Sequence, residues 1–241
     1  MEPEDLHKEL MPDVSEINYI WYYMQTASIM APDVRRRLRA AWGFCERHAW
    51  MLLMVESSLR HSFLMGPAVL YSDLLGRAAA VLRTRGPMRE ARIARGLRDR
   101  RACLMCSMDL NQARGKYAGE ETIRRSRDPG EFTSLVEATR KYWEDKVCGI
   151  CRGDDSPVRC RRHLIEDLKR GITPEGFDYH IDELENVRRR LAAYGRSCRW
   201  EHRGTASLED KAGLIRAVGW CSGWRPLLRL AEEVREAAVG S

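Results

Sequence analysis

Residues 147–164 read VCGICRGDDSPVRCRRHL and contain a complete set of ligands for one tetrahedral metal ion. A C-x2-C pair is followed, after a loop of eight residues, by a C-x2-H pair. This spacing lets both side chains of each pair reach the same ion from one turn of backbone. The loop includes Gly153 and Pro157, which favour a tight polar turn. The stretch therefore predicts a metal site with the ligands Cys148, Cys151, Cys160 and His163.

The same two half-motifs occur again, far apart in the chain. Cys45-x2-His48 and Cys103-x2-Cys106 complete a second set of three thiols and one imidazole if the chain returns between them. Two helices expected over 45–61 and 67–83, followed by an Arg-rich segment, allow that return. We therefore expect these four residues to share one ion. Zinc is favoured over iron, because Cys3His is typical of closed structural zinc sites whereas iron–sulfur clusters usually take four thiolates.

The stretch Gly43-Phe-Cys-Glu-Arg-His48 resembles one half of a motif pair in an uncharacterised, mainly actinobacterial family of cysteine-rich helical proteins. In that family C-P-x-C precedes G-[FL]-C-x2-H. Here the first half falls on Met11-Pro-Asp-Val14, which keeps the proline and lacks both thiols. The resemblance covers roughly residues 1–165 and implies a helical fold and metal binding, without a substrate. Because the usual partner pair is absent, Cys45 and His48 either recruit Cys103 and Cys106 or stay without metal.

Composition points to a globular protein. The chain of 241 residues is long enough to bury a core without help from metal. Its richest apolar run, Ala49 to Val55, is far shorter than the roughly 18 residues that a membrane span needs. The N-terminus is acidic and shows no secretory signal. We therefore expect a cytoplasmic protein without a membrane partner, whose cysteines bind metal instead of forming disulfides.

Apolar residues recur at helical spacing along most of the chain. The clearest segments are 15–30, 45–61, 67–83, 179–194 and 227–238. No run alternates β-branched and polar residues over the length of a strand. The predicted fold is all-α, a multi-helix bundle with one or two structural zinc sites. Its predicted parts are an N-terminal helical region, 1–102, and a zinc-binding helical region, 103–241, unless the two form one continuous domain.

Two stretches near the C-terminus, 198–205 and 219–226, are rich in tryptophan and arginine. If the intervening helix brought them together, they would form a pocket with aromatic walls for a small molecule. Cys221 would be a nucleophile there only if a base such as His202 lowered its pKa. The residues of this predicted pocket are Arg199, Trp200, Glu201, His202, Arg203, Trp220, Cys221 and Trp224.

The function expected from these patterns is that of a zinc-binding module with a binding or regulatory role and a protein or small-molecule partner that the sequence does not identify. An enzyme with the pocket at 198–226 is the first alternative, and no motif names its catalytic residues. The second alternative is weak nucleic-acid binding through the Arg-rich segment 83–101 of a chain with net charge +6. Within that segment an arginine stands at every third position from 89 to 101, so the side chains spiral around a helix instead of forming one stripe.

Overall fold

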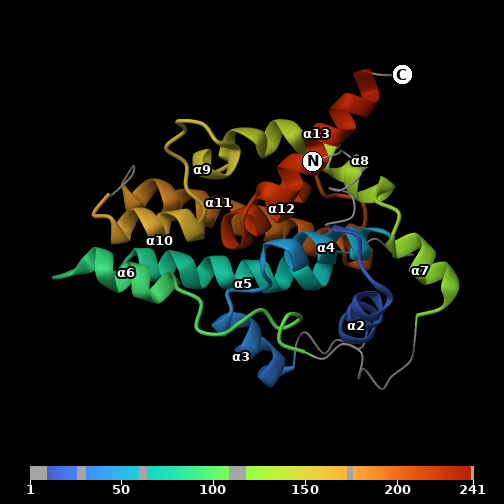
Figure 1. The fold of residues 1–241 in the computed structure, drawn as a ribbon, viewed down its shortest axis with the longest axis horizontal. Coiled ribbons are helices and arrows are strands. Elements are labelled where there is room, and N and C mark those ends of the chain that lie inside the picture. The colour runs from blue at the N-terminus through green and yellow to red at the C-terminus, as the bar shows by residue number, and fades with distance from the viewer. Residues whose placement is uncertain (1–9, 26–30, 60–63, 109–117, 173–175, 240–241) are drawn as a thin grey trace.

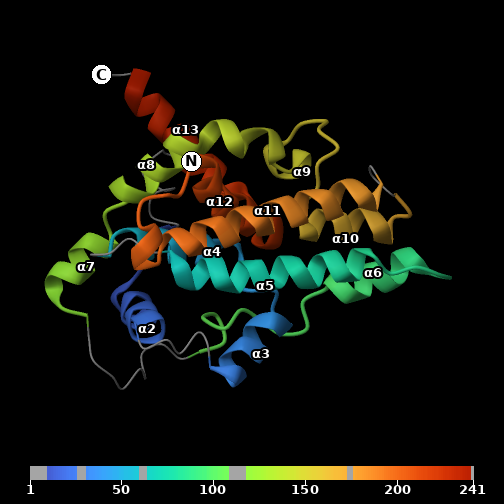
Figure 2. The ribbon, with the colours of Figure 1, turned by 180° about the vertical axis from the view of Figure 1, so that it is seen from behind.

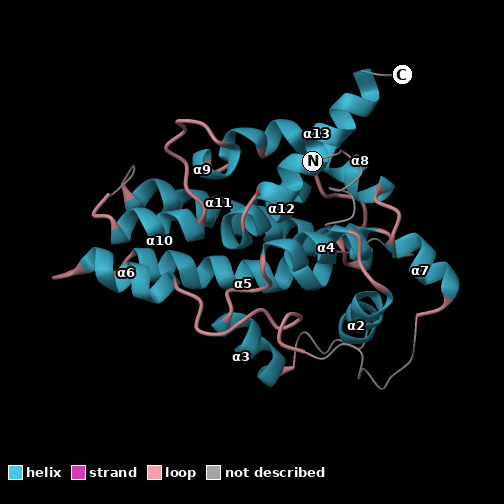
Figure 3. Ribbon diagram, in the orientation of Figure 1, coloured by secondary structure: helices cyan, strands magenta, loops and turns pink. Residues whose placement is uncertain are grey.

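The computed structural model describes residues 10–25, 31–59, 64–108, 118–172 and 176–239 (Figure 1). Helices dominate these ranges, and no residue within them forms a strand (Figure 3). The all-α prediction is therefore confirmed. The elements are α2 (Val14–Gln25), α3 (Pro32–Ala40), α4 (Glu46–Ser57), α5 (Met65–Leu82), α6 (Arg89–Leu97), α7 (Glu120–Ser126), α8 (Gly130–Thr139), η3 (Arg140–Tyr142), η4 (Glu144–Lys146), α9 (Gly149–Arg152), α10 (Arg161–Lys169), α11 (Phe177–Ser197), η5 (Trp200–His202), α12 (Leu208–Ser222) and α13 (Arg225–Val239).

The two longest helices, α5 and α11, lie side by side in the middle of the fold (Figures 1 and 2). Helix α12 packs against both of them, and α4 and α8 pack on α12 in turn. Helices α6 and α10 pair at one end of this centre, while α2 and α3 lie on the side opposite α9 and α13 (Figure 1). The hydrophobic core runs from Leu10 to Ala231 and so includes residues from both sides of the predicted division at residue 102. The division itself stays a prediction.

Three tryptophans form the aromatic centre of this core. Trp224 lies with its ring centroid 6.2 Å from that of Trp143 in a stacked arrangement, and 6.3 Å from that of Trp50. All three side chains are almost completely buried. Trp50 also donates a hydrogen bond from its indole nitrogen to the carbonyl of Gly223, at 2.9 Å. The aromatic centre therefore joins α4, the α12–α13 turn and the segment after α8.

Several helix boundaries follow from local chemistry. The capping box expected at Ser207 is present: Ser207 Oγ accepts a hydrogen bond from the Asp210 amide, and the Asp210 carboxylate accepts one from the Ser207 amide. The helices expected over 45–61 and 67–83 are α4 and α5, displaced by a few residues at their ends. The helix expected over 15–30 is α2, and residues 26–30 lie outside the described ranges.

Helix α6 covers only part of the Arg-rich segment 83–101, and one of its faces is buried. Helix α6 ends at Leu97, and it packs on the core through Ile93 and Leu97, which are fully buried. The chain leaves the helix because its next backbone groups bond to the end of α3 and the turn after it. The Arg100 amide donates to the Ala40 carbonyl at 2.8 Å, and Trp42 donates from its indole nitrogen to the Arg98 carbonyl at 3.2 Å. These bonds direct the chain toward Cys103.

Glu56 on α4 is a buried carboxyl whose Oε2 has no hydrogen-bond partner. Burial raises the pKa of Glu56 to about 8. Between an unfolded pKa near 4.5 and the folded value, the native state holds a proton that the unfolded state has lost, so stability falls as pH rises. We expect Glu56→Gln to increase the free energy of unfolding at pH 9 by roughly 2 to 5 kcal/mol and to flatten its pH dependence. Urea unfolding from pH 5 to 9 measures this, and the exposed Glu120→Gln is the control.

Candidate metal centres

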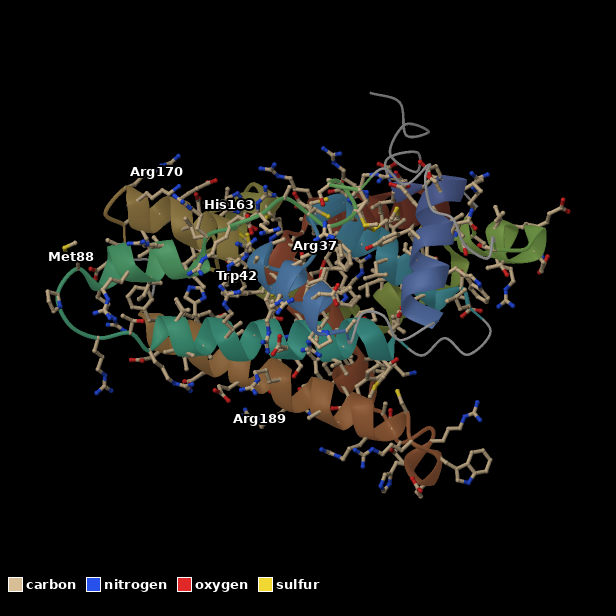
Figure 4. All side chains as sticks on the ribbon, turned by 90° about the horizontal axis from the view of Figure 1, so that it is seen from below. Arg37, Trp42, Met88, His163, Arg170 and Arg189 are labelled. Atoms are coloured by element: carbon tan, nitrogen blue, oxygen red, sulfur yellow. The ribbon has the colours of Figure 1, made fainter. Side chains whose placement is uncertain are left out.

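The compact cluster predicted from residues 147–164 is present, and we call it the C-terminal tetrad: Cys148, Cys151, Cys160 and His163. Its three sulfurs surround Nδ1 of His163 at 3.2, 3.4 and 3.4 Å, and the sulfurs of Cys151 and Cys160 are 3.9 Å apart. Two ligand atoms that bind one zinc ion at tetrahedral angles lie about 3.6 to 3.8 Å apart. The cluster therefore has nearly the dimensions of a tetrahedral metal site. His163 is labelled in Figure 4 on α10.

The second cluster joins segments far apart in the sequence, and we call it the N-terminal tetrad: Cys45, His48, Cys103 and Cys106. Nδ1 of His48 lies 3.2 Å from the Cys45 sulfur, 3.6 Å from that of Cys103 and 3.3 Å from that of Cys106. The sulfurs of Cys45 and Cys106 are 3.7 Å apart. The eight residues thus fall into the two groups that the sequence predicts, and the Cys45 and Cys103 half-motifs meet.

Both C-x2-H pairs have the same local structure. Cys45 is the N-cap residue of α4, and Cys160 is the N-cap residue of α10. In each pair the histidine follows at the third helical position, where side chains approach the N-cap residue. Cys148 likewise precedes the single turn of α9. Helix N-termini favour negative charge, which suits the thiolate ligands of a metal site.

Gly149 lets the loop between the ligands of the C-terminal tetrad close, and it was not among the site residues predicted from the sequence. A Cβ at this position would lie 2.2 Å from the Ser156 carbonyl oxygen, so only glycine lets the loop close over α9. The Gly149 amide donates to the Val158 carbonyl at 3.0 Å and completes that closure. The glycine after the first ligand, in Cys-Gly-x-Cys, was the sequence signal for this close approach.

Glu16 on α2 is a second residue that sequence reasoning missed. Nε2 of His48 lies 3.0 Å from the Glu16 carboxylate, while Nδ1 of the same ring faces the three sulfurs. Burial opposes ionisation of Glu16, but hydrogen bonds from His48 and Arg47 lower its pKa to about 2. A carboxylate on the far nitrogen of a ligating histidine fixes the ring and its tautomer. The available signal was the capping box of α2, in which Asp13 and Glu16 exchange hydrogen bonds of 2.7 and 3.0 Å.

The segment from Met11 to Glu16 lies against α4 beside the N-terminal tetrad. The Met11 carbonyl accepts a hydrogen bond from Arg47, which also pairs with Glu16. The segment therefore contacts His48 and Arg47 from outside the ligand set.

The predicted pocket at 198–226 is not assembled in this structure. Trp200 is 82% exposed, whereas Trp220, Cys221 and Trp224 are buried. Helix α12 separates the two stretches. The first stretch, with η5, lies before the first turn of α12, whereas Trp220 lies in the last turn of α12, about 18 Å further along the helix axis. Burial also raises the pKa of the Cys221 thiol to about 12, while His202 is exposed on η5. Cys221 is therefore not an activated nucleophile.

The eight residues of that prediction instead have separate roles. Trp224 belongs to the aromatic centre of the core. Trp220 and Trp224 line a cavity of only about 20 Å³, too small for an organic ligand. The remaining members before α12 are exposed around η5: Arg199, Trp200, Glu201, His202 and Arg203.

The fold and the two tetrads define an all-helical protein with two Cys3His clusters, each able to hold a metal ion. Comparison with protein-family models, with curated proteins and with solved structures finds no match for this chain. Among the described residues, no helix combines the length and the apolar character that crossing a membrane requires.

Proposed function

We propose that each tetrad binds one zinc ion in a structural role and that the protein acts as a binding or regulatory module. The observation that carries this proposal is the near-tetrahedral spacing of three sulfurs and one imidazole nitrogen in both clusters. Three thiolates and one neutral imidazole form a common structural zinc set. Iron–sulfur clusters, which usually take four thiolates, are the less suitable occupant.

A structural role is supported by the completeness of each ligand set. Four protein ligands leave zinc no open position for water or substrate, whereas catalytic zinc sites keep one. In the N-terminal tetrad the ion would join the start of α4 to the segment that follows α6. In the C-terminal tetrad it would join α9 to the start of α10. Both ions would therefore hold the ends of helices in place.

Of the two alternatives, the enzyme with a pocket at 198–226 has less support, because Trp200 is exposed on η5 while Trp220 and Trp224 are buried at the far end of α12. Nucleic-acid binding through 83–101 has little support from the side-chain positions. Arg89 stacks on the Phe177 ring at 4.4 Å, and Arg92 donates to the Arg85 carbonyl at 3.0 Å. Arg89 and Arg92 therefore serve local contacts within the protein.

Cobalt substitution tests the structural role. Protein refolded with Co²⁺ in place of zinc should show the absorption of two tetrahedral thiolate sites. Addition of azide or cyanide should leave these spectra unchanged, because no coordination position is open. A spectral change on anion addition would reveal an open site and favour a catalytic role. Protein purified without chelator that contains no zinc would overturn the proposal.

Glu16 provides a prediction specific to the N-terminal tetrad. Partners of a metal-bound histidine typically contribute 10- to 100-fold to metal affinity. We therefore expect Glu16→Gln to weaken one zinc site by roughly tenfold or more and to leave the other unchanged. Competition with a chromophoric chelator measures both affinities. The control is Glu120→Gln on the exposed surface of α7. Equal affinities in the variant and the control would show that Glu16 only anchors α2.

A further inference from the structure

An open depression lined mainly by arginines, which we call the arginine cavity, lies where α3, α5 and α11 meet. Its volume is about 800 Å³, and it is open to solvent. Seen from below, α3, α5 and α11 lie next to one another, with Arg37 and Trp42 labelled near α3 and Arg189 on α11 (Figure 4). The charged side chains that line the cavity are Arg36, Arg39, Asp73, Arg77, Arg100 and Arg188.

Contacts beneath the cavity hold its arginines in position. Arg77 stacks on the buried ring of Trp42, 4.3 Å from the ring centroid, and donates to the Arg39 carbonyl. Arg100 is held at the rim by its amide, which donates to the Ala40 carbonyl at 2.8 Å. The guanidinium of Arg188 lies flat on Gly76, where a Cβ would be 3.1 Å from its Cζ. The cavity wall therefore contains arginines that are held in place by their contacts. It also contains Gly76, whose lack of a side chain leaves room for the Arg188 guanidinium.

Positive charge exceeds negative charge in the cavity wall. Asp73 is the single acidic member of the wall, and it is already paired with Arg39 and, at 3.2 Å, with Arg35. Arg36 and Arg100 are exposed and have no side-chain partner in the part of the chain that the structure describes. Nε of Arg188 is buried without a hydrogen-bond partner, while another nitrogen of the same guanidinium lies 3.7 Å from the Glu185 carboxylate. Burial, and after it the neighbouring charges of Arg100, Arg39 and Arg161, lower the pKa of Arg77.

We propose that this cavity binds a small anion that carries two or more phosphate groups, of the pyrophosphate or tripolyphosphate class. The planar guanidinium matches the oxygens of a phosphate, and several guanidiniums around one cavity match a ligand with several negative charges. A single-stranded nucleic acid fits less well, because such ligands need exposed aromatic rings on which bases stack. The aromatic ring at this site, Trp42, is fully buried beneath Arg77.

Isothermal titration calorimetry with sodium tripolyphosphate tests this proposal on the zinc-loaded full chain. Wild-type protein should bind one equivalent, and Arg36→Gln combined with Arg100→Gln should weaken binding at least about tenfold. The matched control combines Arg125→Gln with Arg170→Gln, two exposed arginines elsewhere, and should retain wild-type affinity at the same net charge. Unchanged zinc content and melting temperature in both double variants establish that they are folded. Arg188→Gln is an independent second variant and should also weaken binding.

Three outcomes would overturn the proposal. The first is no saturable binding of tripolyphosphate at moderate ionic strength. The second is an equal loss in the control, which would mean that general positive charge attracts the anion. The third is tighter binding of a short oligothymidylate than of tripolyphosphate, lost in the same cavity variants, which would assign the surface to a nucleic-acid backbone.

Discussion

Replacing Cys103 with serine is expected to remove one equivalent of zinc and to lower the free energy of unfolding by more than about 3 kcal/mol. The proposed zinc site at the N-terminal tetrad joins residues 45–48 to residues 103–106. Loss of one ligand would therefore release a long-range link and leave the buried His48 and the half-buried Cys45 without their ion. Elemental analysis gives the zinc content, and urea unfolding gives the stability.

Cys151→Ser is also expected to remove one equivalent of zinc, with a smaller effect on stability. The C-terminal tetrad spans only residues 148–163, so its metal link closes a much shorter loop than the one between the N-terminal half-motifs. The difference in loop-closure entropy amounts to about 1 kcal/mol. Cys198→Ser is the control, because Cys198 belongs to neither tetrad and the variant should keep two zinc ions. A Cys103→Ser protein that retains two zinc ions would contradict the pairing of the half-motifs.

Trp224→Ala is expected to destabilise the protein by about 3 to 5 kcal/mol, the usual cost of removing a large buried aromatic side chain. The Trp224 side chain is 2% exposed and packs between Trp143 and Trp50. Its ring also lies so close to Gly219 that a Cβ there would be 2.3 Å from the indole. The space vacated by the ring is enclosed by these neighbours, so a cavity should remain.

Trp200→Ala is the matched control for this prediction. Trp200 is 82% exposed on η5, and we expect its removal to change the free energy of unfolding by less than about 0.5 kcal/mol. Denaturant unfolding of both variants measures the contrast. Similar losses of stability in the two variants would show that the C-terminal tryptophans are packed together, as the pocket interpretation of the sequence required.

The C-terminal tetrad could be predicted almost completely from the sequence. Two half-motifs with a short polar loop between them leave few backbone arrangements, so spacing alone specifies which four side chains meet. The N-terminal tetrad could be predicted by elimination, because Cys103 and Cys106 were the remaining C-x2-C pair. The helices were equally accessible, since the 3.6-residue period of apolar side chains is a local property of the chain.

Contacts between elements were accessible only from the tertiary structure. The tryptophans 200, 220 and 224 look alike in the sequence, but Trp220 on α12 and Trp224 in the turn after it are buried in the core, whereas Trp200 is exposed on η5. The contact of Glu16 with His48 depends on how α2 lies against α4, and the arginine cavity depends on the meeting of three helices. Local spacing determines which atoms one turn of backbone can bring together. Burial and charge clustering depend on which helix faces pack, and no period in the sequence specifies that choice.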